Sequence, residues 1–92
     1  MDLKELRLKI DSIDENLIRL FEKRMEISEE IAKYKLKHKM PVHDPSREQQ
    51  KLLELSHKVK KEYKSYITPL YTVLFKLSHI HQEQIISSGK II

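Results

Sequence analysis

The feature that most constrains this chain is an uninterrupted helical pattern over residues 4–37. Apolar side chains recur there in alternating steps of three and four residues, which is the spacing of a helix seam, and the span contains no Gly or Pro. A helix of this length reaches about 50 Å, whereas a compact monomer of this size has a radius of gyration of about 12 Å. The helix must therefore project beyond any globule that the chain makes alone. A second copy of the chain is the simplest cover for its seam.

Length and composition indicate one domain, residues 1–92, with too few residues for a second core. The chain contains no cysteine, and charged side chains interrupt the N-terminal region where a signal peptide needs an apolar run. It also has no apolar stretch of about 18 residues, the length that spans a membrane. We therefore expect a cytoplasmic protein with no membrane partner. The formal charge of +4 favours an anionic partner.

Capping signals divide the rest of the chain into two further helices. Asp44 followed by Pro45 is typical of an N-cap and first helical position, and Thr68 followed by Pro69 repeats that pattern. The last helix should stop before Gly89, with a frayed tail after it. The sequence thus predicts an all-α fold with three helices. Their expected ranges are residues 4–37, 45–63 and 68–88.

Polar residues occupy positions on the first helix where apolar ones are expected. Arg24 interrupts the seam, and on a helix Ser28 and Lys35 lie about 40° and 20° from it, so all three share a face. Arg24 and Lys35 are about 16 Å apart along the axis, a gap that two long side chains can close around a small molecule. An anionic ligand would supply the charge that buried cations need. Alternatively, both side chains reach solvent or pair with an acid of another helix.

The other two helices carry similar features. Ser78 and Gln82 are four residues apart and therefore lie on one face of a largely apolar helix. They suit either a ligand or ordinary hydrogen bonds between helices. Arg47 and Glu48 lie beside the unpaired N–H groups at the start of the second helix, where an anion or a hydroxyl binds well. Arg47 is equally compatible with a surface charge.

Taken together in order, these residues resemble the all-helical chorismate mutase family. The likeness covers nearly the whole chain, and it is the ordered set that is specific, because each motif alone is weak. The resemblance implies an intertwined homodimer of three-helix subunits that converts chorismate to prephenate. The matching positions are Arg7, Asp14, Arg24, Lys35, Pro41, Val42, Asp44, Arg47, Glu48, Ser78 and Gln82.

The resemblance also implies roles for the residues that contact the two carboxylates and the ether oxygen of the substrate. Arg24 and Ser78 would hold one carboxylate. Arg7 of the partner chain and Lys35 would hold the other. Lys35 and Gln82 would donate hydrogen bonds to the oxygen of the breaking C–O bond. The expected active site is therefore built from two chains.

At the ring of the substrate, the resemblance implies that the backbone of Asp44 and the side chain of Glu48 bind the hydroxyl, with Arg47 supporting this polar cluster. The third helix differs from many relatives in His79 and His81, which are expected to flank the site. These two histidines point about 200° apart on a helix, which does not suit a metal. We expect neither a metal nor a cofactor, because the rearrangement moves electrons within one molecule and needs only restraint and charge stabilisation.

Two other functions remain open from the sequence. An isochorismate pyruvate lyase of the same fold would use nearly the same cations. A non-enzymatic basic helical module would bind nucleic acid or a partner helix through basic residues clustered on one exposed face. The lysines of this chain are instead interleaved with Glu and Asp, which is typical of a solvated surface. We therefore expect no nucleic-acid partner.

Overall fold

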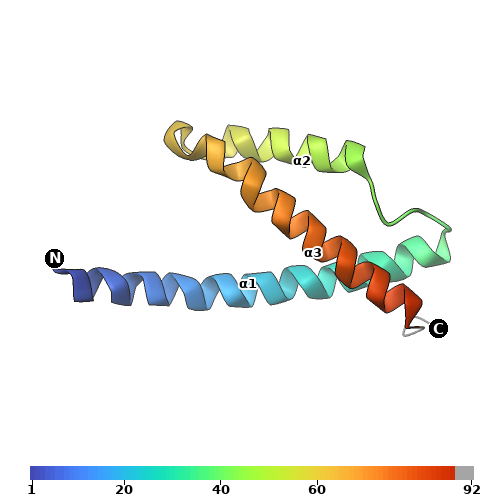
Figure 1. The fold of residues 1–92 in the computed structure, drawn as a ribbon, viewed down its shortest axis with the longest axis horizontal. Coiled ribbons are helices and arrows are strands. Elements are labelled where there is room, and N and C mark those ends of the chain that lie inside the picture. Colours follow the sequence, from blue (N-terminus) through green and yellow to red (C-terminus); the bar gives the residue numbers. More distant parts are fainter. Residues whose placement is uncertain (89–92) are drawn as a thin grey trace.

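The computed structural model describes residues 1–88, and these form an all-α structure as the sequence predicts. The elements are α1 (Leu3–Lys37), α2 (Pro45–Lys58), the 3₁₀ helix η1 (Lys61–Tyr66) and α3 (Ile67–Ser87). Within residues 1–88 there is no strand. Figure 1 shows α1 as a single long rod, with α3 crossing its C-terminal half and α2 folded back beside α3.

Helix α1 begins and ends at well-formed caps. The Asp2 carboxylate accepts a hydrogen bond from the backbone N–H of Glu5 at 2.8 Å. At the other end Lys39 takes a left-handed conformation, with φ of 53°. The N–H groups of Lys39 and Met40 then bond to the carbonyls of Leu36 and Lys35, which is the Schellman pattern. This motif ends α1 at Lys37, two residues after Lys35, and reverses the chain toward α2.

The described chain is extended, as the length of its first helix predicts. Its principal extents are 53 × 27 × 15 Å, and its radius of gyration is 16.5 Å, above the value of about 12 Å for a compact chain of this length. Helix α3 contacts α1, α2 and η1. In Figure 1 the N-terminal half of α1 runs past these contacts with no other helix over it.

Little apolar surface is buried within residues 1–88 of this chain. Ala32 and Ile85 are the buried hydrophobic residues among residues 1–88, and they lie on α1 and α3, two helices that contact each other. The N-terminal seam of α1 is exposed instead. Its exposed members are Leu3, Leu6, Ile10, Ile13, Leu17 and Leu20.

Two predicted boundaries differ from the structure. The second helix ends at Lys58 rather than near residue 63, because the extended backbone of Val59 breaks it and lets η1 turn the chain back. Thr68 was expected to cap the third helix, but α3 begins at Ile67. The N–H of Ile67 bonds to the Lys64 carbonyl of η1. Because η1 runs directly into α3, its carbonyls meet the start of the helix and no side-chain cap forms.

Helix α3 ends at Ser87, so the predicted stop before Gly89 agrees with the structure. The expected frayed tail at residues 89–92 lies outside the described residues. Among the helices of residues 1–88, none combines the length and the apolar character that a bilayer crossing requires.

Candidate active site

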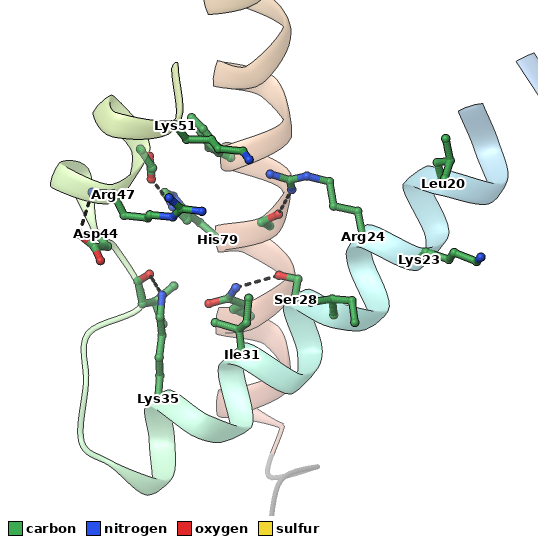
Figure 2. A pocket seen from close by; sticks show the side chains of 16 residues that line it. Leu20, Lys23, Arg24, Ser28, Ile31, Lys35, Asp44, Arg47, Lys51 and His79 are labelled. Atoms are coloured by element: carbon green, nitrogen blue, oxygen red, sulfur yellow. Dashed lines mark hydrogen bonds and ion pairs between the residues drawn. The ribbon is translucent and has the colours of Figure 1, made fainter. Parts of the chain in front are cut away.

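One pocket collects nearly all of the predicted site residues. It has a volume of about 540 Å³ and lies between the C-terminal half of α1, the start of α2 and the middle of α3. A volume of this size is typical of small-molecule sites. Figure 2 shows side chains from all three helices converging on it. The predicted residues that line it are Arg24, Lys35, Asp44, Arg47, Glu48, Ser78 and Gln82.

Arg24 reaches from α1 toward α3, where its Nη1 donates to the Ser78 hydroxyl at 2.8 Å (Figure 2). The guanidinium carbon also lies 6.0 Å and 5.9 Å from the ring centroids of Tyr71 and Phe75. Ser78 is buried. A hydrogen bond to one nitrogen and two aromatic rings nearby hold the guanidinium in place while its other N–H groups stay available to a ligand.

Lys35 lies at the opposite end of the pocket and reaches toward the loop before α2 (Figure 2). Its Nζ donates to the backbone carbonyl of Val42 at 2.7 Å. This contact depends on the turn at Lys39, which brings the following loop back over the end of α1. An ammonium group carries three donors, so two remain for a ligand.

Gln82 and Ser28 form the buried floor of the pocket. The Gln82 Nε2 donates to the Ser28 hydroxyl at 2.8 Å, and the two residues are only 5% and 4% exposed. The Gln82 Oε1 is buried with no hydrogen-bond partner in residues 1–88. An unpaired buried amide oxygen is costly, and the opposite orientation of the amide would relieve that cost, because the Ser28 hydroxyl can donate to the oxygen.

The start of α2 forms the third wall. The Asp44 carboxylate caps the helix by accepting from the backbone N–H of Arg47 at 3.1 Å, with Pro45 at the first position as predicted. The Glu48 carboxylate accepts a hydrogen bond from Nε2 of His79 on α3 at 3.0 Å. Asp44 and Arg47 are exposed, whereas Glu48 is half-buried.

Charge in the pocket is predominantly positive. Neither Arg24 nor Lys35 forms an ion pair with a carboxylate within residues 1–88. Within residues 1–88, Arg24 and Lys35 therefore do not pair with an acid of another helix, which was the alternative interpretation of the sequence. Two partly buried cations without carboxylate partners create a site that suits an anion.

Some lining residues were not predicted as site residues. Lys51 reaches from α2 toward α3 in Figure 2, and its spacing of four from Arg47 was a signal that it shares that face. His79 was expected only to flank the site, but it lines the pocket and holds Glu48. His81 turns to α1 instead and bonds to Glu29 at 2.7 Å. The sequence alone did not reveal the contacts of either histidine, since they join separate helices.

Arg7 is the one predicted site residue that does not line the pocket of its own chain. It is exposed on the N-terminal half of α1. At a rise of about 1.5 Å per residue it lies about 25 Å along the helix from Arg24. Its role in the site of a partner chain stays a prediction.

The sequence is similar to known proteins over most of its length. The family model of chorismate mutase type II matches residues 6–83. The chain is 48% identical over 46 residues to a T-protein of Haemophilus influenzae, which is 50% of this chain and 12% of that protein. It is 41% identical over 61 residues to a bifunctional chorismate mutase/prephenate dehydratase of Aquifex aeolicus, covering 63% of this chain and 17% of the relative.

A third relative aligns with almost the whole chain. It is a bifunctional chorismate mutase/prephenate dehydratase of Buchnera aphidicola subsp. Schizaphis graminum, 32% identical over 88 residues, or 94% of this chain and 23% of that protein. The chain thus spans between 12% and 23% of the length of these relatives. The matched family segment contains Arg7, Arg24 and Lys35 from α1, the start of α2, and Ser78 and Gln82 from α3. This chain belongs to the chorismate mutase type II family.

Proposed function

We propose that this chain catalyses the rearrangement of chorismate to prephenate. The observation that carries the proposal is the convergence of Arg24, Lys35, Ser78 and Gln82 on one pocket. Chorismate is a dianion with an ether bridge and a ring hydroxyl, so it needs cations at two ends and neutral donors between them. The family and the names of the relatives point to the same reaction.

The reaction requires that the substrate be held in one conformation and that its developing charge be stabilised, rather than covalent catalysis. Electrons move within one molecule, so no nucleophile and no proton transfer are needed. The site must fold a flexible substrate into a chair and stabilise the charge that develops on the ether oxygen. Arg24, held by Ser78 and the nearby rings, would bind one carboxylate. Lys35 would bind the other and donate to the ether oxygen.

Gln82 would act through its amide. Turning the amide by about 180° places Oε1 on the Ser28 hydroxyl, which then donates to it, and directs Nε2 at the pocket. This turn satisfies the buried oxygen that otherwise lacks a partner. It also replaces an acceptor by a donor next to the ether oxygen, whose charge grows in the transition state. Substrate binding and the hydrogen bond gained by the buried Oε1 therefore favour the same orientation of the Gln82 amide.

The active form would be a homodimer. The exposed apolar seam from Leu3 to Leu20 is continuous with the pocket, since Leu20 also lines it. A second copy running antiparallel would cover this seam and bring the partner's N-terminal half past the pocket. Arg7 could then reach the partner's bound substrate. Sedimentation equilibrium tests this assembly, and a monomer at micromolar concentration would contradict it. The cytoplasmic location of this protein also stays a prediction.

The decisive assay follows the loss of the ultraviolet absorbance of chorismate and the formation of prephenate. A parallel assay with isochorismate, scoring release of pyruvate, separates the mutase from a pyruvate lyase of the same fold. We expect conversion of chorismate, and no pyruvate release at a comparable rate. Pyruvate release faster than prephenate formation would assign the lyase reaction instead.

A further inference from the structure

We infer that His79 is a positioning residue, which holds the Glu48 carboxylate so that one of its oxygens faces the substrate's ring hydroxyl. The inference rests on the proposed function and deepens it. His79 Nε2 lies 3.0 Å from Glu48 Oε2, joining α3 to α2 across the pocket wall. Both side chains are largely covered, with 20% and 25% of their surfaces exposed.

The hydrogen bond leaves the carboxylate with a free end. A neutral imidazole with its proton on Nε2 donates to Oε2, so Oε1 remains to accept from a ligand hydroxyl. Glu48 has three rotatable bonds before the carboxylate, and an unheld side chain would lose rotamer freedom when substrate binds. His79 restricts that freedom in advance, which lowers the cost of binding.

A second histidine supports the first from the loop before α2. The rings of His43 and His79 lie 4.0 Å apart between centroids at an angle of 34°, and His43 Nε2 lies 3.1 Å from Glu83 Oε1. His43 and Glu83 are both exposed, whereas His79 is not. The tilted ring of His43 therefore packs against His79 and restricts its movement.

Other charged groups surround this contact but do not replace it. Arg47 and Lys51 line the same pocket, and Lys76 lies with Glu48 and His79 around a neighbouring cavity. None of these three cations forms an ion pair with Glu48 in residues 1–88. The orientation of Glu48 therefore depends on His79.

A bond to a spectator hydroxyl is present in both the ground state and the transition state. Loss of such a bond raises KM and leaves kcat nearly unchanged. We expect His79→Ala to raise KM for chorismate by about 3- to 10-fold with kcat within about twofold. His79→Gln keeps a donor at a similar reach and should restore most of the affinity. For a chorismate analogue that lacks the ring hydroxyl, His79→Ala and the wild type should have the same KM.

His81 is a matched control, because it lies on the same helix as His79 but does not line the pocket. It makes an equivalent His–Glu bond, with Glu29 of α1. His81→Ala should leave KM unchanged. In a Glu48→Ala background, His79→Ala should cause no further rise in KM. An equal rise in both backgrounds, or a KM change as large in His81→Ala, would overturn the inference.

A measurement without substrate separates this inference from the proposed function. Glu48→Ala should shift the ring ¹⁵N resonances of His79 in the whole protein and leave those of His81 in place. Unchanged His79 resonances would refute the contact even in an active enzyme. If the wild-type chain converts no chorismate, the proposed function fails, whereas the resonances of His79 still decide whether it holds Glu48.

Discussion

The side chains of Gln82 and Ser28 bond to each other at 2.8 Å across the α1–α3 interface, 54 positions apart in the chain. Both are buried, so the bond has no competition from bulk water. It places the amide of Gln82 at the floor of the pocket that the cations Arg24 and Lys35 also line. The contact explains why a hydroxyl stands on the apolar face of α1.

Ser28→Ala should lower kcat by about 2- to 10-fold, because a net hydrogen bond of about 0.5–1.5 kcal/mol no longer holds the Gln82 amide. Steady-state kinetics with chorismate checks this. Ser56→Ala is a suitable control, since the half-buried Ser56 lies outside this pocket and its hydroxyl bonds only to the Leu53 carbonyl of its own helix in residues 1–88. Full kcat in Ser28→Ala would mean that the amide needs no such support.

Gln82→Glu should be much less active near neutral pH than in acid. An ionised carboxylate repels the ether oxygen, whereas the protonated acid still donates to it. With the dianionic substrate bound, the cations of the pocket are neutralised, and burial beside the substrate's carboxylates disfavours the charged form and raises the pKa of the introduced carboxyl above its usual value of about 4.3. Activity should therefore fall as pH rises through that raised pKa. A rate profile from pH 5 to 9 checks this, with Gln82→Ala, expected to lose kcat at least about tenfold, as the reference.

Lys35→Ala should lower kcat by at least about tenfold, because it removes a charged donor aimed at the ether oxygen in the transition state. Lys33→Ala on the exposed side of α1 is the matched control, since Lys33 pairs only with Glu30 in residues 1–88. Kinetics of the two variants should differ mainly in kcat. A change in KM alone for Lys35→Ala would limit Lys35 to holding a carboxylate.

Arg7→Ala and Arg24→Ala should each be inactive alone but regain activity when unfolded and refolded together. The two residues lie about 25 Å apart and face directions about 100° different on one helix, so one small substrate cannot touch both from the same chain. In a heterodimer with shared sites, one site collects both mutations and the other has neither. Random pairing then leaves about a quarter of all sites intact.

A mixture that stays inactive although both variants fold and exchange chains would refute the shared site. Arg7 would then be a surface charge. Chain exchange is verified separately: one variant carries an affinity tag, and mass spectrometry shows whether the other variant is purified with it. A mixture without heterodimers is then not mistaken for heterodimers without activity.

Lys39→Gly should stabilise the protein by up to about 1 kcal/mol. A residue with a side chain costs about 1–2 kcal/mol in the left-handed conformation, and the extra freedom of glycine in the unfolded chain offsets part of the gain. Lys37→Gly, inside the last turn of α1, should instead destabilise it by about 0.5–1 kcal/mol. Denaturant unfolding compares the two. A loss of stability in Lys39→Gly would show that the lysine side chain contributes to the turn.

The sequence by itself determined the all-α fold, the long first helix and the start of the second. Those features rest on interactions between near neighbours: the seam repeats every three or four residues, and Asp44 caps the helix that Pro45 begins. The family likeness also placed Arg24, Lys35, Ser78 and Gln82 in a common site. The structure brings these four side chains to one pocket.

Tertiary structure alone decided which side chains touch. The bonds of Gln82 to Ser28, His79 to Glu48 and Lys35 to the Val42 carbonyl depend on how helices and the loop are placed against one another. Helix periodicity states which face a residue occupies but not which residue of another helix lies opposite it. The end of the second helix was predicted wrongly for the same reason. The turn at Val59 and η1 leads the chain into α3, which packs against α1. No local sequence pattern predicts that packing.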